Sequence, residues 1–250
     1  MQYGICPLSI VPVRLIADNA SELCTQLLYG DYFKILEQRK FWSKIRVSFD
    51  AIEGWVNNKQ IQLISEEVYN TIHQSGKHKY ASDLVSFVST SNNVLVPIVI
   101  GSSVQNTTIL QHTFDGDYID TVIKKEALID IALLYLNAPY LWGGKTPFGI
   151  DCSGFTQMVY RINGYHLLRN AAQQATQGEP LSFIEESEPG DLAFFDNNEG
   201  IIDHVGIIME NNYIIHSSGK VRIDRIDHTG IFNTELKSYT HKLRVIKKII

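Results

Sequence analysis

The feature that most constrains the fold is a glycine-rich loop that runs directly into an amphipathic helix. The loop, residues 143–150, holds three glycines and a proline in eight residues. After it, apolar residues recur at the spacing of one helix face: Phe155, Met158, Val159 and Ile162. Asp151 is a natural N-cap, so the thiol of Cys152 is predicted in the first helical turn. Unpaired N–H groups and the helix dipole favour the thiolate there, which points to a nucleophile.

Two histidines further along the chain strengthen this interpretation. Taken alone, Cys152 reads as a small apolar residue of a packed helix. His204 and His216, however, lie on successive apolar strands joined by a tight turn at Asn211-Asn212. Folding about that turn brings the two histidines together across the ladder. Cysteine catalysis needs a base and a third group that orients the base, so we predict these two roles for His204 and His216. The other six histidines are assigned no role: His73, His78, His112, His166, His228 and His241.

Composition sets the outer limits. A chain of 250 residues allows one or two domains, and 44% hydrophobic with 20% charged residues is ordinary for a globular protein. The net charge of −5 and the lack of any Lys/Arg run argue against a nucleic-acid partner. No apolar stretch is long enough to span a membrane. Residues 1–14 do not read as a signal peptide, so a cytoplasmic location is expected if Met1 is the native start.

Cysteine usage agrees with a reducing compartment. The three cysteines, Cys6, Cys24 and Cys152, have neither disulfide-framework nor metal-ligand spacing. Cys6 and Cys24 lie among apolar neighbours, and we interpret both as structural. No cofactor is expected.

The first quarter of the chain, residues 1–65, predicts a small β barrel. Short runs of β-branched and aromatic residues suggest strands at 10–15, 32–38, 41–49, 54–57 and 61–64. A long polar loop is expected between the first two, at 18–30. This order, with its late Gly54-Trp55, resembles a bacterial Src-homology-3-like barrel.

The remaining chain divides at about residue 120. Residues 66–120 suggest a second, irregular β barrel or linker domain, since alternating and apolar runs are separated by turn residues. Residues 121–250 predict an α+β domain, with helices at 121–136, after Cys152 and at 171–177. Antiparallel strands should follow at 191–195, 204–209, 213–217, 221–226 and 243–249.

The motif around the cysteine carries a family resemblance. The block Tyr-x-Trp-Gly-Gly…Asp-Cys-Ser-Gly-Phe, residues 140–155, resembles the NlpC-type cell-wall cysteine peptidases, a papain-like family. Residues 188–192, His204-Val205-Gly206 and the His216 segment follow in the family's order. With the N-terminal barrel, the chain resembles the gamma-D-glutamyl-L-diamino-acid endopeptidases, also called dipeptidyl-peptidase VI. The resemblance implies a papain-like catalytic domain preceded by one or two small β barrels.

The resemblance also implies the reaction. Cys152 would be the nucleophile, His204 the base and His216 the third polar residue. Tyr140 matches a tyrosine whose hydroxyl helps to hold the oxyanion, with the backbone N–H of Cys152 or Ser153 as the other donor. The substrate would be a murein peptide with a free N-terminal L-alanine. Cleavage between the D-glutamate side-chain carboxyl and the diamino acid would release L-Ala-D-Glu.

Substrate-binding residues follow from the same motifs. The free ammonium of the substrate calls for an acidic pocket, and Asp151 matches the family's acidic residue there while also suiting helix capping. Ser153 and Trp142 are further expected contacts, and Glu22 in Ser21-Glu22-Leu23 matches a second amine-facing carboxylate. Two departures bear on binding: Ile52 replaces a tyrosine that relatives carry, and Ala171 replaces a serine.

Three alternatives remain at this point. A related clan uses the same Cys–His–His set for lipid or ester acyl transfer, although no amphipathic or membrane-anchoring segment is evident. A peptidoglycan-binding module with an inert catalytic half is a second alternative, against which the retained Cys152, His204 and His216 argue. A zinc site from these three residues and Asp151 is conceivable by ligand type, but a nucleophile explains the helix-start cysteine better.

Overall fold

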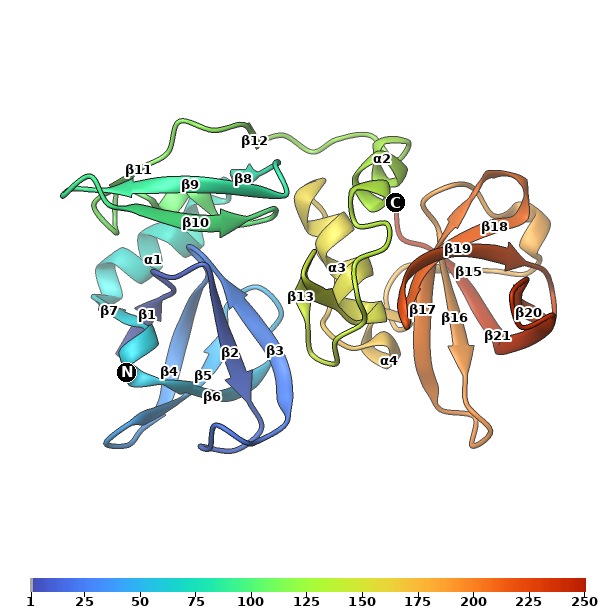
Figure 1. Ribbon diagram of the computed structural model, residues 1–250, viewed down its shortest axis with the longest axis horizontal. Helices are drawn as coiled ribbons and strands as arrows, with labels where there is room; N and C mark the ends of the chain where they lie inside the picture. Colours follow the sequence, from blue (N-terminus) through green and yellow to red (C-terminus); the bar gives the residue numbers. More distant parts are fainter. Residues whose placement is uncertain (1) are drawn as a thin grey trace. The chain divides into compact units, whose positions relative to one another are not determined.

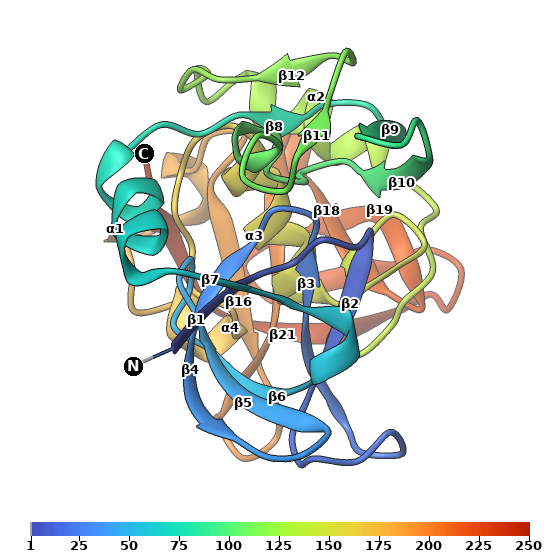
Figure 2. The same cartoon turned by 90° about the vertical axis from the view of Figure 1, so that its left-hand side faces the viewer.

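The structure, a computed structural model, describes residues 2–250. The chain divides into two compact units. One unit extends to Val122 and includes Trp142–Pro147, and the other comprises Ile123–Leu141 and Phe148–Ile250. Each is built on its own seven-stranded antiparallel sheet (Figures 1 and 2). Within residues 2–250, no helix is both long and apolar enough to cross a membrane.

The sheet of the first unit has the strand order β3-β2-β6-β5-β4-β1-β7. The strands are β1 (Gln2–Ile5), β2 (Ile10–Arg14), β3 (Leu23–Leu28), β4 (Tyr32–Gln38), β5 (Trp42–Val47), β6 (Glu53–Asn57) and β7 (Gln62–Ile64). Alternate side chains point into one core that contains Val11, Leu27, Phe33 and Val56. The curvature of β4, β5 and β6 around this core is visible in Figure 2.

Residues 66–122 complete the first unit with one helix and several short strands. The helix α1 (Glu66–Ser75) begins at Ser65, whose hydroxyl accepts from the N–H of Val68, and ends at the left-handed Gly76. The strands are β8 (Tyr80–Ala81), β9 (Val85–Thr90), β10 (Leu95–Val99), β11 (His112–Thr113) and β12 (Tyr118–Ile119). A second core joins Val88 and Ile98 to Ile5 and Tyr29.

Two local predictions for the first unit were wrong. The expected loop at 18–30 contains the strand β3, in which the alternate residues Thr25 and Leu27 are buried against β2. Thr25 and Gln26 gave that run a polar composition that hid its period of two. The helix α1 was missed, although Ser65-Glu66-Glu67 and Gly76 are ordinary start and stop signals.

In the second unit the sheet closes on itself. Its strand order is β15-β21-β16-β17-β18-β19-β20. An additional pairing between β20 and β21 closes all of these strands except β15 into a six-stranded barrel. The strands are β15 (Glu179–Leu181), β16 (Leu192–Asp196), β17 (Ile202–Met209), β18 (Tyr213–Ser218), β19 (Lys220–Ile226), β20 (Gly230–Asn233) and β21 (Ser238–Lys248). Phe195, Ile208, Ile214 and Ile246 belong to the core of this sheet.

Three helices belong to the second unit: α2 (Ala127–Leu134), α3 (Cys152–Ile162) and α4 (Ala171–Gln174). The helix α3 packs on β17 and β18 and also contacts α2 and α4 (Figure 1). Every residue of α3 is buried, so the first turn that carries Cys152 is fixed from several sides. The motif loop contains two short strands, β13 (Lys145–Thr146) in the first unit and β14 (Gly149–Ile150) in the second.

The helix before the motif is shorter than the expected span 121–136. It starts only at Ala127, since the N–H of Ile123 donates to the carbonyl of Asn163 and holds the preceding residues outside the helix. It ends before Asn137, which adopts a left-handed φ of 68°. The helix predicted at 171–177 likewise ends at Gln174.

Candidate active site

Cys152 is the first residue of α3, as the sequence predicted. The Asp151 side chain caps the helix by accepting from the N–H of Gly154 at 2.6 Å. The Cys152 side chain is buried, and its Sγ lies 3.8 Å from the carbonyl oxygen of Asp203, which directly precedes His204. The thiol therefore lies beside the start of β17.

The protonation of Cys152 differs from the expectation. Burial, with the Asp151 carboxylate beside it, raises the pKa of the Cys152 thiol to about 12. The backbone N–H groups of Val205 and Ser153 and the Arg169 guanidinium act in the opposite direction, but their effect is smaller. In the free site the thiol is protonated, so the thiolate must form by proton transfer to a base. Desolvation of the buried sulfur outweighs the favourable position at the helix start.

His204 and His216 are hydrogen-bonded to each other. The His204 Nε2 lies 2.8 Å from the His216 Nδ1, and the His216 Nε2 lies 3.0 Å from Asp224 Oδ2. Hydrogen bonds from His216 and Arg222 hold the pKa of Asp224 below its usual value although burial raises it, so Asp224 is a carboxylate that accepts only. His216 therefore carries its proton on Nε2 and accepts at Nδ1 from the Nε2–H of His204. That tautomer leaves His204 Nδ1 with the free lone pair of a base.

The β17–β18 hairpin positions the two histidines by register. Asn211 and Asn212 both adopt left-handed φ values of 59°, which suits the tight turn that the sequence predicted. The turn pairs Gly206 directly with His216 across the ladder. A Cβ atom on Gly206 would lie 2.9 Å from the Cβ of His216, so glycine makes room for that imidazole.

A third histidine covers His204. The ring of His241, on β21, stacks on the ring of His204 with centroids 4.1 Å apart and an interplanar angle of 25°. Burial, with His216 nearby, lowers the pKa of His241 to about 4, and burial lowers the pKa of His204 well below its usual value. Both rings are neutral at pH 7. His241 was not predicted to take part in the site, since its proximity to His204 arises from the pairing of β21 with β16 and β20.

This histidine cluster does not have the geometry of a metal centre. One ring nitrogen from each of His204, His216 and His241 lies within 4.8 Å of the other two. The rings of His204 and His241 are face to face, however, so their in-plane lone pairs run side by side and do not converge on one ion. Asp151, in the zinc set considered above, has both carboxylate oxygens bonded to Arg169.

Arg169 joins Asp151 and Ser153 in a buried cluster. Its guanidinium donates to both oxygens of Asp151, at 2.9 and 2.6 Å, and to the Ser153 hydroxyl at 3.0 Å. The Arg169 side chain is 1% exposed, and Asp151 is also buried. The negative charge of Asp151 is thus matched by a fixed cation. Arg169 was not among the site residues predicted from the sequence.

Tyr140 lies in the second unit, where its N–H donates to the carbonyl of Gly219. Partial burial, with the Asp151 carboxylate nearby, raises the pKa of Tyr140 to about 12. Its hydroxyl is therefore protonated at pH 7, as a donor to a developing oxyanion must be.

Glu22 and Trp142 meet in the first unit. The Trp142 indole N–H donates to the Glu22 carboxylate at 2.8 Å, and the Trp142 side chain is otherwise largely exposed. Next to them, Gly143 adopts φ 75° and lies against the backbone of Leu23, where a Cβ atom would be 2.4 Å from a carbonyl oxygen. The structure thus pairs two of the predicted substrate-binding residues.

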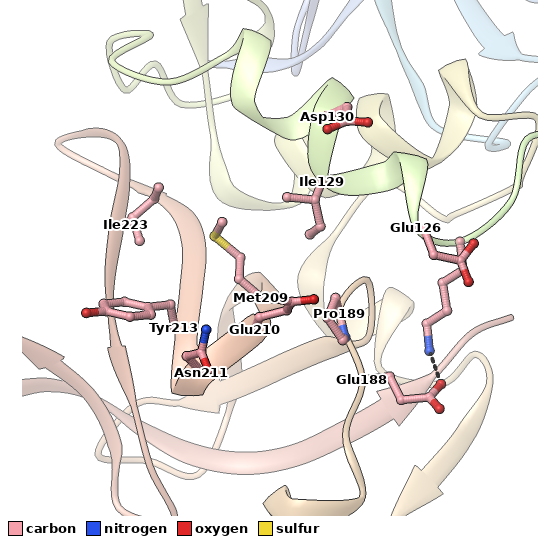
Figure 3. Close-up of a pocket in the computed structure, with 11 residues that line it drawn as sticks. Glu126, Ile129, Asp130, Glu188, Pro189, Met209, Glu210, Asn211, Tyr213 and Ile223 are labelled. Atoms are coloured by element: carbon pink, nitrogen blue, oxygen red, sulfur yellow. Dashed lines mark hydrogen bonds and ion pairs between the residues drawn. The ribbon is translucent and has the colours of Figure 1, made fainter.

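A separate hollow of the second unit lies away from His204, His216 and His241 (Figure 3). It has a volume of about 770 Å³, and Glu126, Ile129 and Asp130 of the α2 region face Met209 and Tyr213 across it. Met209 is five residues beyond His204 along β17, roughly 16 Å at strand spacing. This hollow therefore belongs to the turn end of the hairpin and not to the candidate active site.

The fold and the site together define a papain-like cysteine peptidase: a helix-start cysteine packed on an antiparallel sheet that carries the histidine base. Comparison with known proteins agrees. Residues 137–240 match the NlpC/P60 family, and residues 16–61 match the bacterial dipeptidyl-peptidase Sh3 domain. The chain therefore contains an NlpC/P60 cysteine peptidase domain, which is preceded by a bacterial SH3 domain.

Relatives span most of the chain. The gamma-D-glutamyl-L-lysine dipeptidyl-peptidase of Bacillus subtilis (strain 168) is 27% identical over 231 residues, which cover 82% of this chain and 77% of that protein. Dipeptidyl-peptidase 6 of Lysinibacillus sphaericus is 26% identical, covering 84% and 86%. A crystal structure of an NlpC/P60 family protein from Bacillus cereus covers 99% of both chains with a TM-score of 0.79 at 17% identity, which shows the shared fold.

Proposed function

We propose that this peptidase hydrolyses the gamma-D-glutamyl-L-diamino-acid bond of murein peptides with a free N-terminal L-alanine and releases L-Ala-D-Glu. The observation that carries the chemistry is the buried chain from Asp224 through His216 to His204, which leaves a basic nitrogen on His204. The choice of substrate is supported by the relatives named gamma-D-glutamyl-L-lysine dipeptidyl-peptidase and dipeptidyl-peptidase 6.

In the proposed mechanism, His204 Nδ1 takes the Cys152 proton as the sulfur attacks the γ-carbonyl carbon of D-glutamate. The Tyr140 hydroxyl and a backbone N–H of the α3 start stabilise the oxyanion. His204 then gives its proton to the departing α-amine, and the C–N bond breaks to leave a thioester on Cys152. Water, deprotonated by His204, hydrolyses the thioester and restores the thiol.

We propose that carboxylates bind the free N-terminal amine of the substrate. Asp151, with Ser153 beside it, is the candidate in the second unit, and Arg169 fixes its orientation through two hydrogen bonds. Glu22, held by Trp142, is the candidate in the first unit. A requirement for the free amine limits the substrate to released peptides and suits murein peptide recycling. The sparse, odd set of three cysteines supports a cytoplasmic location.

The test compares L-Ala-γ-D-Glu-L-Lys with its N-acetylated form, using wild type and Cys152→Ala. We expect L-Ala-D-Glu from the free peptide only, and none from the variant. Equal cleavage of the acetylated peptide would contradict the amine-reading roles of Asp151 and Glu22. No cleavage of either peptide by folded wild-type protein would overturn the proposed substrate and direct attention to acyl esters.

A further inference from the structure

A polar hollow of about 520 Å³ lies beside the candidate catalytic histidine, entirely within the second unit. Asp196 and the β16–β17 loop form one side, and His241 and Lys242 of β21 form another. Asp203, the residue before His204, also lines it. Nothing in the sequence analysis assigned this hollow a ligand.

The hollow is close to the reacting atoms. The Asp203 carbonyl oxygen is 3.8 Å from Cys152 Sγ, and the His241 ring stacks 4.1 Å from the ring of His204. The acyl part of the substrate becomes bonded to Cys152, whereas the leaving amine must receive its proton from His204. The leaving amine must therefore come next to His204, whose neighbours Asp203 and His241 line the hollow.

Asp196, one of the residues that line the hollow, has a carboxylate oxygen that lacks a donor. The Asp196 side chain is 6% exposed, and among the described residues its Oδ1 is buried without a hydrogen-bond partner. Its Oδ2 has only a long ion pair, 3.9 Å from the Nε of Arg244, whose side chain is 63% exposed. A buried carboxylate oxygen without a donor is costly, and a ligand ammonium would remove that cost.

The other charged residues that line the hollow are compatible with a cationic ligand. Asp203 is exposed and adds a second carboxylate, whereas Lys242 is exposed and is the one cation among the residues that line the hollow. Tyr239 already donates to Asp227, so its hydroxyl does not serve Asp196. His241 is neutral at pH 7 because burial lowers its pKa to about 4.

We propose that this hollow is the subsite for the leaving diamino acid, and that Asp196 and Asp203 bind its side-chain ammonium. The inference rests on the proposed function and adds to it the residues that select a cationic residue after the scissile bond. A lysine side chain suits such a site, since it carries a compact ammonium on a flexible four-carbon stem.

The test removes the side-chain ammonium of the leaving residue but keeps its four-carbon side chain. L-Ala-γ-D-Glu-L-Lys is compared with L-Ala-γ-D-Glu-L-norleucine in wild type, Asp196→Asn, Asp203→Asn and Glu199→Gln. Glu199 lies in the same β16–β17 loop but does not line the hollow, so Glu199→Gln is the matched charge control. We expect wild type and Glu199→Gln to favour the lysine peptide by about tenfold or more in kcat/KM, and the ratio to fall toward one in both aspartate variants.

The readout is the ratio of kcat/KM for the lysine peptide to kcat/KM for the norleucine peptide within each variant. A general loss of activity lowers both values and leaves this ratio unchanged. Asp203→Asn alters an exposed side chain and carries the test if Asp196→Asn does not fold. Equal cleavage of both peptides by wild type would overturn this subsite but leave the proposed function standing. An unchanged ratio in both aspartate variants would also overturn it. Cleavage of neither peptide would overturn the proposed function and the subsite together.

Discussion

His216 donates from Nε2 to Asp224 Oδ2 across 3.0 Å, and this bond sets the proton positions of both histidines. Arg222 donates to both oxygens of Asp224, at 2.6 and 3.0 Å, and holds the carboxylate in place. Asp224 is thus a positioning residue two hydrogen bonds away from the nitrogen proposed to act as the base.

Replacing Asp224 by asparagine should therefore lower kcat more than it raises KM. The amide can donate to His216 and stabilise the wrong tautomer, so we expect a loss of roughly tenfold to hundredfold in kcat. Steady-state kinetics of Asp224→Asn measure this. The matched control is Asp227→Asn, which removes a carboxylate bonded to Tyr239 and to backbone N–H groups outside the histidine chain. Equal kinetic losses in the two variants would contradict the positioning role.

The buried histidines should make the protein less stable in mild acid. Burial lowers the pKa of His204, His216 and His241 below that of a free histidine, so the unfolded chain binds protons that the folded protein does not. The free energy of unfolding therefore rises with pH up to about 6.5. Each histidine that is protonated only in the unfolded chain contributes a slope of about 1.4 kcal/mol per pH unit. Urea unfolding at pH 5 and pH 7 measures the slope. His241→Phe keeps the ring but removes one titrating group, and should flatten it.

Alkylation should report the protonation of Cys152. Because burial raises the pKa of the thiol to about 12, the substrate-free protein should react slowly with iodoacetamide at pH 7 and faster as pH rises. Mass spectrometry of the Cys152 peptide follows the rate, with Cys152→Ala as the background control for Cys6 and Cys24. A fast rate that is constant across neutral pH would show a resting thiolate instead.

Removing one partner of the Arg169–Asp151 ion pair should lower the free energy of unfolding more than removing both charges. Arg169→Met leaves a buried carboxylate without its cation, and we expect a loss of about 3–5 kcal/mol in unfolding free energy. The double variant Asp151→Asn with Arg169→Met should recover most of that loss, since asparagine still caps α3. Activity on the free peptide should stay low in the double variant. Chemical denaturation of Arg169→Met, Asp151→Asn and the double variant tests the coupling, and additive losses would contradict it.

Local signals were enough to predict the centre of the site. The N-cap at Asp151 and the apolar period after it predicted the α3 start, and Asn211-Asn212 predicted the hairpin that pairs His204 with His216. Both depend on neighbours within a dozen residues.

The other groups of the site were not predictable from such signals. Asp224 lies only eight residues beyond His216, but its contact depends on the β18–β19 register, and His241 reaches His204 only after β21 pairs with β16 and β20. Arg169 meets Asp151 through a loop that has no periodic pattern. The pKa of Cys152 likewise depends on burial, which follows from the packing of the whole unit.

The most direct test is to trap the acyl-enzyme. Wild-type protein mixed with L-Ala-γ-D-Glu-L-Lys, quenched in acid within a turnover and digested, should carry the L-Ala-γ-D-Glu acyl group as a thioester on Cys152. Neither Cys6 nor Cys24 should carry it, and Cys152→Ala should show neither adduct nor cleavage. An acyl group on another residue, or cleavage that persists in Cys152→Ala, would contradict the account.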